Sequence, residues 1–242
     1  MKHLGPREAQ LLADLLQSAG IVVSREVQVD TLRYLDGVID ANTRLNLTRI
    51  SGAEAGVRLH IVDSLLALEE VEASPPGPLL DVGTGGGFPG VPLCLASGRE
   101  GVLIDSVGKK ARAVDEILAE LGMASRIRTI SIRAEEAAAQ DGARFAVVTA
   151  RAVSELPALV ELASPLLAPG GRLIALKGAP DEGEFGRAQR VCAMVGMKET
   201  SRRRLVVPGG EERRTVVSYT RVGPPSLRLP RRNGMAQTSP LA

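Results

Sequence analysis

The chain is short of aromatic residues, cysteine and histidine. Its 242 residues include three Phe, two Tyr and no Trp, so its core must be built from aliphatic side chains. The two cysteines, Cys94 and Cys192, lie far apart in apolar stretches, which favours reduced core thiols over a disulfide framework. With His3 and His60 as the only histidines, we expect no zinc or other metal site.

Long hydrophobic runs are also missing. No apolar segment approaches the roughly 20 residues of a membrane helix, and the N-terminal "MKHLGPREAQ" has no apolar region of the signal-peptide kind. We therefore expect a cytoplasmic protein with no membrane contact, and a monomer. Hydrophobic residues make up 44% of the chain, enough for the core of one α/β domain with additions.

Positive charge is concentrated towards the C-terminus. The formal net charge is only +2, but residues 201–242 hold nine Arg against two Glu. A basic region on a mildly acidic body suggests an anionic partner such as a nucleic acid. A solubilising, loosely structured tail would have the same composition, so the charge alone leaves both interpretations open.

Hydrophobic spacing divides the chain into three parts. Residues 1–72 are expected to form a helical extension, residues 73–222 an α/β domain, and residues 223–242 a basic, flexible tail. In the extension, helices are expected over 7–17, from the cap Ser24 onward, and over about 53–71.

From Pro78 onward, strand patterns alternate with helical patterns. Strands are expected at 79–83, 102–106, 127–132, 145–150, 172–178, 203–207 and 214–221, with a turn at Pro169-Gly170-Gly171 and a helix near 182–196. This alternation predicts a Rossmann-like α/β fold, with a mostly parallel seven-stranded sheet covered by helices on both faces. The last two strands could pair as a hairpin at the sheet edge.

The stretch "DVGTGGGFPG" (81–90) is a glycine loop between the first strand and a helix. The loop lacks the Gly-Lys-Ser/Thr ending of a phosphate-binding P-loop. It also departs from the dinucleotide-binding motif G-x-G-x-x-G, because Phe88 stands at the position of the third glycine. The pattern D-x-G-x-G-x-G, formed by Asp81, Gly83, Gly85 and Gly87, is typical of S-adenosylmethionine loops. Asp81 would then meet the ligand's ammonium, directly or through water, and the helix N–H groups its carboxylate.

Acidic residues follow the next two strands. Asp105 ends the second strand beside Ser106, where its carboxylate could accept hydrogen bonds from ribose hydroxyls or cap the following helix. Ala134 and Glu135 follow the third strand, where an adenine edge would rest. Glu135 could equally be a plain acid in a first helical turn.

Several segments in one order resemble a known family. They are "NLTRI" (46–50), "HIVDSLL" (60–66), "DVGTGGGFPGVPL" (81–93), "DSVGKK" (105–110), "RAEE" (133–136), "ARAVSEL" (150–156) and "GGRLIALKG" (170–178). Together they resemble the small-subunit ribosomal RNA guanine-N7 methyltransferases, once called glucose-inhibited division protein B. The resemblance runs from Asn46 to Gly178, and "LPRRNGMAQTSPL" echoes a tail of some members.

This resemblance implies S-adenosylmethionine as cofactor and a guanine of 16S ribosomal RNA, or of the small ribosomal subunit, as substrate. It implies cofactor contacts at Gly83, Phe88, Ala134, Glu135 and Arg151, with Asp105 at the ribose. Three positions depart from the family pattern, namely Leu59, Ala113 and Ala146. None of them removes a cofactor position.

Guanine N7 has no proton to lose, so its methylation needs positioning more than a general base. Arg151 and Lys177 each end an apolar strand segment and are candidates to orient the base, although Lys177 could be a solvated strand end. His60 and Asp63 lie three apart on one helical face and could orient a nucleotide or tie the helices to the sheet. Asn46 could meet a base edge or cap a helix.

Phosphate contacts are expected from Lys109 and Lys110 and from the arginine groups at 202–204, 213–214 and 231–232. Three functions other than rRNA methylation stay open from the residues alone. They are a methyltransferase for another substrate, an NAD-dependent oxidoreductase, and a non-catalytic RNA-binding protein.

Overall fold

Seven strands form one sheet in the computed structural model, which describes residues 3–50 and 52–241. The strand order is β3-β2-β1-β4-β5-β7-β6, and only the pairings of β7 with β5 and β6 are antiparallel. The strands are β1 (Leu79–Val82), β2 (Gly101–Asp105), β3 (Ile127–Ser131), β4 (Phe145–Arg151), β5 (Leu167–Lys177), β6 (Met197–Val206) and β7 (Arg213–Arg221). The predicted mostly parallel sheet with a terminal hairpin is confirmed.

Strand order reverses at β1, which pairs with β2 on one side and with β4 on the other. In open α/β sheets, ligands bind beyond the carboxyl ends of the strands at such a reversal. The glycine loop follows β1 at this position.

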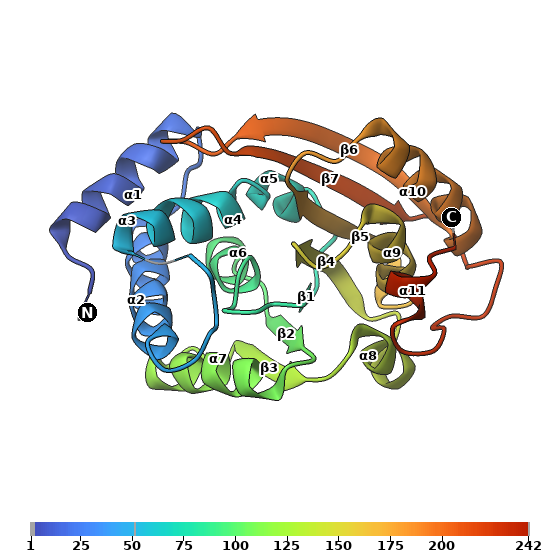
Figure 1. The fold of residues 1–242 in the computed structure, drawn as a ribbon, viewed down its shortest axis with the longest axis horizontal. Helices are drawn as coiled ribbons and strands as arrows, with labels where there is room; N and C mark the ends of the chain where they lie inside the picture. Colours follow the sequence, from blue (N-terminus) through green and yellow to red (C-terminus); the bar gives the residue numbers. More distant parts are fainter. Residues whose placement is uncertain (1–2, 51, 242) are drawn as a thin grey trace.

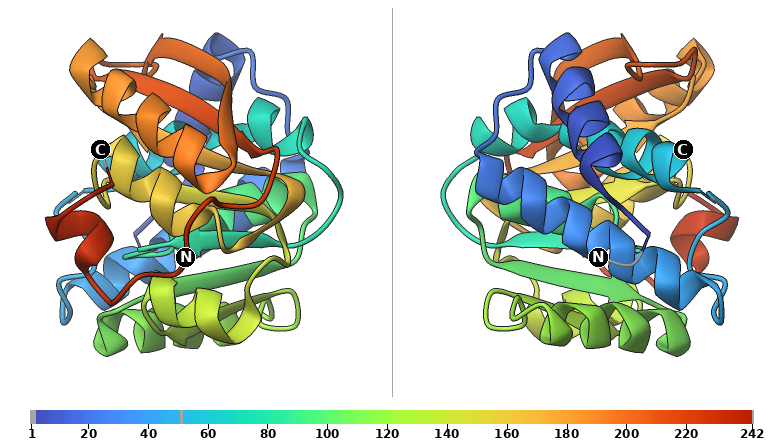
Figure 2. Two further views of the ribbon diagram at one scale, coloured as in Figure 1. Left: turned by 90° about the vertical axis from the view of Figure 1, so that its right-hand side faces the viewer. Right: turned by 90° about the vertical axis from the view of Figure 1, so that its left-hand side faces the viewer.

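Helices cover both faces of the sheet (Figure 1). On one face lie α1 (Pro6–Ser18), α2 (Arg25–Asn42), α3 (Ala53–Gly56), the π-helical turn η1 (Val57–Val62), α4 (Asp63–Leu65), α5 (Leu68–Glu72), α6 (Gly90–Ser97) and α7 (Gly108–Glu120). On the other face lie α8 (Ala134–Asp141), α9 (Leu156–Ala163), α10 (Glu182–Val195) and α11 (Met235–Thr238). Figure 2 shows the two helical layers from opposite sides.

Each face of the sheet has its own aliphatic core. The first core joins Leu12 and Leu35 of the N-terminal helices to Leu93 and Leu103 of the α/β unit. The second includes Leu80, Leu159 and Val191. Because the first core is shared, the helical extension packs as part of the same body; the boundary near residue 72 remains a proposal.

Helix starts follow the capping signals in the sequence. Ser24 caps α2 by accepting a hydrogen bond from the Val27 N–H (3.2 Å), as predicted. Asp181 caps α10 in the same way through the Glu184 N–H (2.7 Å). No helix within residues 3–50 and 52–241 is long and apolar enough to span a membrane.

Two local predictions differ from the structure. The expected turn at Pro169-Gly170-Gly171 lies inside β5, where a bulge shifts the register between Phe145 and Val147 and Gly170 takes a positive φ of 77°. The predicted helix over 53–71 is helical over most of its length, but residues 57–62 are π-helical and a two-residue turn at 66–67 separates α5 from the rest.

The expected loose tail also differs, because residues 223–241 run back over the body and include α11, whose Ala236 is buried. The composition of this segment is typical of an unstructured tail. The residues that hold it in place, such as Glu161 and Glu135, lie far away in the sequence, so the prediction could not take them into account.

Candidate active site

Two cavities meet at Gly83, beyond the carboxyl ends of the central strands. The larger holds about 590 Å³ and is lined by the glycine loop, residues 47–50, His60, Asp63, Arg151, Lys177 and Arg214. The smaller holds about 70 Å³ and is lined by Asp105, Ser106, Ala134, Glu135 and Gln237 among others. Most of the residues predicted for the site are therefore brought together, although they come from distant parts of the sequence.

The glycine loop contains three glycines with positive φ at alternate positions, namely Gly83 (67°), Gly85 (58°) and Gly87 (86°). A Cβ at Gly83 would lie 2.7 Å from Val153, so the backbone here passes close to the neighbouring loop. A Cβ at Gly87 would overlap the Tyr34 hydroxyl of α2. The absence of a side chain at Gly87 thus makes room for Tyr34 of α2, and the predicted contact of Gly87 with a ligand stays a prediction.

Asp81 lies wholly inside the core, with no exposed surface. Its carboxylate accepts hydrogen bonds from the Thr149 hydroxyl (2.7 Å) and the Gly90 N–H (3.1 Å), and burial raises its pKa to about 6. Because Asp81 is not exposed, a contact with a ligand ammonium through water fits this geometry better than a direct one, and the contact itself stays a prediction. Asp81 also ties β1 to β4 and to the start of α6.

Asp105 faces the smaller cavity and also organises the backbone around it. Its Oδ2 accepts from the Gly85 N–H (2.9 Å) and its Oδ1 from the Val107 N–H (2.8 Å). The carboxylate therefore caps the turn before α7 while lining the cavity, which is compatible with both sequence interpretations. Ser106 beside it is exposed at the cavity wall.

Ala134 and Glu135 begin α8 at the far wall of the smaller cavity, and both are buried. Glu135 accepts a hydrogen bond from the Gly234 N–H (2.6 Å). It is therefore more than a first-turn acid, because it connects the cavity wall to the C-terminal segment.

Arg151 and Arg214 share one buried carboxylate. Arg151 donates to Asp63 Oδ2 at 2.9 Å, and Arg214 donates to Oδ1 at 2.6 Å and Oδ2 at 3.0 Å. Asp63 is only 1% exposed. Two guanidinium groups against one carboxylate leave a net positive charge beside the larger cavity, which suits an anionic ligand.

His60 and Phe88 stack face to face, with ring centroids 4.3 Å apart. The Nδ1 of His60 accepts from Arg151 Nη2 (3.3 Å), since an arginine can only donate, so Nε2 carries the proton towards the Thr48 hydroxyl (3.0 Å). Burial, followed by the charge of Arg151, lowers the pKa of His60 to about 3. His60 is therefore neutral at pH 7 and holds Arg151 in place.

Lys177 lines the larger cavity, and its ammonium group is fixed by two partners. Its Nζ donates to the Ser154 carbonyl (2.8 Å) and pairs with Glu184 (3.0 Å), so it is not a solvated strand end. Asn46 is exposed and lies outside the cavity lining, next to Leu47 and Thr48, which line it.

Sequence reasoning missed several residues of the site. Asn42 holds the loop of residues 47–50 by accepting from the Leu47 and Thr48 N–H groups (2.8 and 3.0 Å). Arg49 lines the cavity and is exposed. Nothing in the sequence around Asn42 or Arg49 indicated a role in the site. The loop of residues 47–50 reaches the cavity only in the folded chain.

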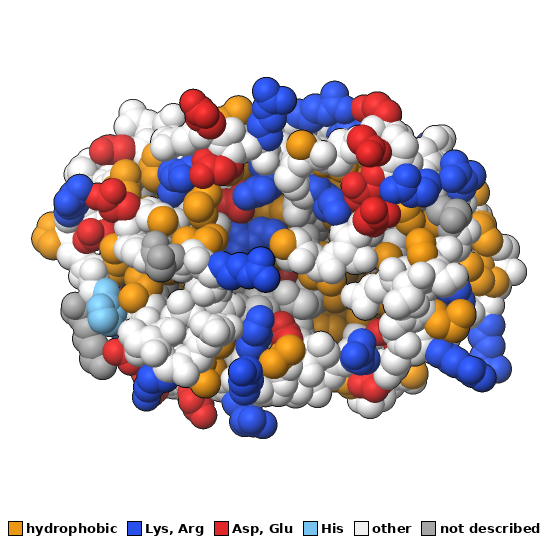
Figure 3. All heavy atoms as spheres, viewed as in Figure 1, with side chains coloured by type: hydrophobic (Ala, Val, Ile, Leu, Met, Phe, Trp, Pro, Cys, Tyr) orange, Lys and Arg blue, Asp and Glu red, His pale blue; other side chains and the backbone are white. Residues whose placement is uncertain are grey.

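Figure 3 shows Lys and Arg side chains gathered down the middle of one face of the molecule. Four of the cavity-lining residues are basic, namely Arg49, Arg151, Lys177 and Arg214. Within residues 3–50 and 52–241, no cluster of His, Cys, Asp and Glu side chains could hold a metal ion.

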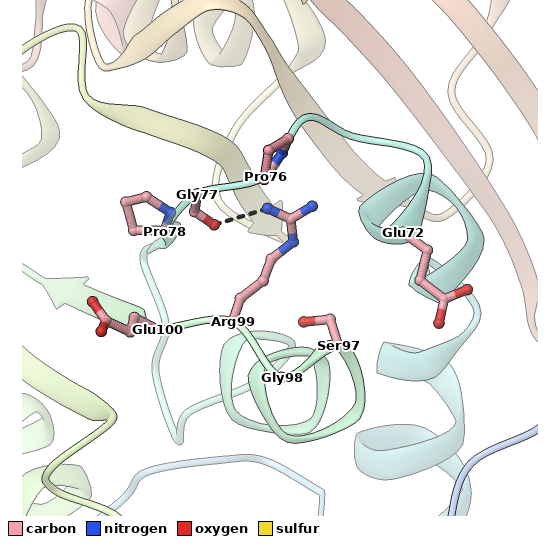
Figure 4. A pocket seen from close by; sticks show the side chains of 8 residues that line it. All are labelled: Glu72, Pro76, Gly77, Pro78, Ser97, Gly98, Arg99 and Glu100. Carbon is pink, nitrogen blue, oxygen red and sulfur yellow. Dashed lines mark hydrogen bonds between the residues drawn. The ribbon is translucent and has the colours of Figure 1, made fainter.

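A third cavity of about 520 Å³ lies near the starts of β1 and β2 and is shown in Figure 4. Its one basic group, Arg99, reaches towards the turn at residues 75–78. There it donates to the carbonyls of Val71, Ser74, Pro75 and Gly77 at 2.7–3.0 Å. Both terminal guanidinium nitrogens of Arg99 thus donate to backbone carbonyls, and no residue of the glycine loop lines this cavity.

Comparisons with known proteins give one consistent result. The family model GidB, rRNA small subunit methyltransferase G, matches residues 28–215. Ribosomal RNA small subunit methyltransferase G of Chloroflexus aggregans is 37% identical over 235 residues, covering 96% of this chain and 98% of the relative. The protein of the same name from Geobacillus kaustophilus is 32% identical, covering 97% and 99%.

Solved structures agree on the fold. An O-methyltransferase from Bacillus cereus in complex with SAH superposes with a TM-score of 0.56 at 16% identity, covering 77% of this chain and 90% of that one. A geranyl diphosphate methyltransferase in complex with GPP and sinefungin also has a TM-score of 0.56 at 16% identity, covering 70% and 80%.

Proposed function

Because the chain belongs to the rRNA small subunit methyltransferase G family, we propose that it transfers a methyl group from S-adenosylmethionine to N7 of one guanine in 16S ribosomal RNA. The observation that carries this proposal is the junction of two cavities of different character at Gly83. One has carboxylates suited to a nucleoside, and the other has surplus positive charge suited to RNA. We further propose that the protein acts as a cytoplasmic monomer on the small ribosomal subunit.

The smaller cavity has side chains that fit the nucleoside half of S-adenosylmethionine, which supplies an electrophilic methyl group on a sulfonium. Asp105 offers carboxylate oxygens to ribose hydroxyls, beside Ser106. Ala134 leaves room for the base, and Glu135 presents an acceptor at its edge. Gly83, which lines both cavities, and Gly85, which lines the larger one, present backbone without a side chain near the point where the cavities meet.

The basic residues of the larger cavity would orient the guanine. Arg151 and Lys177 are fixed by Asp63 and Glu184 respectively, so their donors are positioned before any substrate arrives. N7 must stay free to attack, and these donors therefore serve guanine O6 and phosphate oxygens. Arg49 lines this cavity and Asn46 is exposed next to residues that line it, and we propose that both contact the RNA backbone.

No general base is required for this reaction, and His60 is not built to be one. Its Nδ1 is occupied by Arg151, and its depressed pKa keeps the ring neutral. We propose that His60 and Phe88 form a stacked wall that keeps Arg151 in its catalytic orientation. Holding the guanine and the methyl donor in a reactive geometry contributes roughly 7–11 kcal/mol in favourable cases, and Arg151 would supply part of this positioning.

The proposal is tested by mapping 7-methylguanine in 16S ribosomal RNA from cells with and without the gene, using chemical cleavage and primer extension. We expect one guanine to lose its modification and to regain it with the wild-type gene but not with Asp105→Asn. An unchanged guanine pattern would contradict the substrate assignment. Transfer of label from S-adenosylmethionine to a different molecule would then indicate another methyltransferase substrate.

A further inference from the structure

The C-terminal segment, defined here as residues 231–239, is anchored to a buried carboxylate. Arg231 donates to Glu161 of α9 through Nε (2.7 Å) and Nη2 (2.6 Å), and Glu161 is 3% exposed. Ala236 of α11 is buried, and α11 packs against α9, beside which it lies in Figure 1. A two-point ion pair with a buried acid gives the segment a defined position.

The segment is also bound to the first turn of α8, which forms a wall of the smaller cavity. The Gly234 N–H donates to Glu135 Oε1 and the Asn233 amide to Glu136 Oε1, both at 2.6 Å. Glu135 is one of the residues proposed to hold the nucleoside. The C-terminal segment therefore contacts the proposed cofactor site through Glu135. Oxygen Oε1 of Glu135 already accepts a hydrogen bond from this segment.

Gln237 lines the smaller cavity, together with Gly83, Asp105 and Glu135. The cavity holds only about 70 Å³ with the segment in place, whereas pockets for small ligands and cofactors measure roughly 300–1,000 Å³. The cavity must therefore enlarge to admit a nucleoside, and the C-terminal segment is one of its walls. The amide of Gln237 offers both a donor and an acceptor, as the edge of adenine does.

We propose that residues 231–239 are a movable outer wall of the cofactor site, and that Gln237 contacts the adenosine part of the bound cofactor. The segment opens to admit the ligand and closes over it, held by the Arg231–Glu161 pair. This inference rests on the proposed function, because it concerns the same site. It assigns a binding role to a segment that composition alone describes as a tail.

The first test measures the dissociation constant of S-adenosylhomocysteine by calorimetry, without RNA, for the full-length protein and two variants. Gln237→Ala should weaken binding about fivefold, as expected for the loss of one neutral hydrogen bond. Gln189→Ala, which removes an exposed glutamine of α10 outside both cavities, should leave the constant unchanged. Unchanged or tighter binding by Gln237→Ala would overturn the proposed contact.

The second test follows amide hydrogen exchange in residues 231–239 of the wild-type protein. Saturating S-adenosylhomocysteine should slow exchange in this segment, because the wall closes on the ligand; unchanged or faster exchange overturns the inference. If the wild-type protein does not bind S-adenosylhomocysteine at all, the proposed function fails. If it binds without protecting the segment, only the movable wall fails.

Discussion

At the scale of single residues, the site depends on Asp63 and on what its negative charge holds in place. This carboxylate comes from a short helix and receives guanidinium groups from two strands, β4 and β7. Its side chain is almost fully buried, while those of Arg151 and Arg214 are 13% and 20% exposed. Removing the charge would leave two neighbouring cations without the carboxylate that they share.

Asp63→Asn should therefore lower the free energy of unfolding by about 3 kcal/mol, the size of effect seen when one partner of a buried ion pair is removed. Methyl transfer should fall with it, because Arg151 loses its fixed position. Urea unfolding monitored by circular dichroism measures the first effect. The control is Asp141→Asn, which breaks an exposed pair with Arg144 and should change stability by less than about 0.5 kcal/mol. Equal effects of the two variants would contradict this account.

His60 gives the stability a pH dependence of known sign. Its pKa is lowered from 6.5 to about 3, so below pH 6.5 the unfolded chain takes up a proton that the folded chain refuses. The stability present above pH 6.5 is therefore lost as the pH falls towards 3. Asp81, with its pKa raised from 3.8 to about 6, acts in the opposite direction: its contribution is present below pH 3.8 and lost as the pH rises towards 6.

A comparison of wild type with His60→Gln isolates the histidine contribution, because Asp81 is common to both. Between pH 7 and pH 5, the wild type should lose about 2 kcal/mol more of its unfolding free energy than the variant does, from the linkage relation at the pKa values above. Urea titrations at several pH values give this difference. Parallel curves for the two proteins would show that His60 is not held neutral by burial.

At the scale of elements, the glycine loop is shaped as much by helix α2 as by any ligand. Tyr34 of α2 is fully buried, donates to the Gly86 carbonyl (3.0 Å) and occupies the space beside Gly87. Its ring also meets Phe88 edge-on, with centroids 5.6 Å apart. The N-terminal helices thus support the first loop of the cofactor site directly.

Gly87→Ala should destabilise the protein by about 3 kcal/mol, since it combines overpacking against Tyr34 with a positive φ. Gly98→Ala is the matched control, because Gly98 has a similar φ of 73° but no atom within 4 Å of the added Cβ. It should cost only the backbone strain, about 1 kcal/mol. Thermal unfolding of both variants measures the difference, and similar losses would contradict the packing role of Gly87.

At the scale of the whole molecule, the basic C-terminal region is balanced by acids from other parts of the chain. Arg203 pairs with Glu70, Arg204 with Glu182 and Arg231 with Glu161, while Arg202 pairs with Glu199 and Arg214 with Asp63. Most of the arginines that composition offered for phosphate contact therefore serve the fold. The basic residues that line the larger cavity are better placed to attract RNA.

Arg49→Ala should weaken binding of 16S ribosomal RNA and reduce the slope of log K against log salt by about 0.7–0.9, the loss of one phosphate contact. Cofactor affinity should stay unchanged, since Arg49 lines only the larger of the two cavities. Filter binding over a series of salt concentrations gives the slope. Arg25→Ala, at the exposed start of α2, is the charge-matched control. An Arg49→Ala slope equal to that of the control would remove Arg49 from the interface.

Much of the architecture could be predicted from local patterns. The apolar strand runs, the helical spacing between them and the glycine loop after "LLDV" are sufficient to predict a Rossmann-like sheet. Parallel strands bring their carboxyl ends to one edge, which is why Gly83, Asp105, Ala134 and Arg151 could be grouped from the sequence alone. The resemblance to rRNA methyltransferases added the substrate.

The sequence by itself thus determined the fold class, the succession of strands and helices and the location of the cofactor loop, because each depends on short-range periodicity and turn chemistry. Only the tertiary structure decided that Asp63 holds Arg151 and Arg214, that Gly87 makes room for Tyr34, and that the C-terminal segment lies along the cofactor cavity. Those contacts join residues separated by 53 to 151 positions. Packing of the whole chain, which no local pattern encodes, sets their distances.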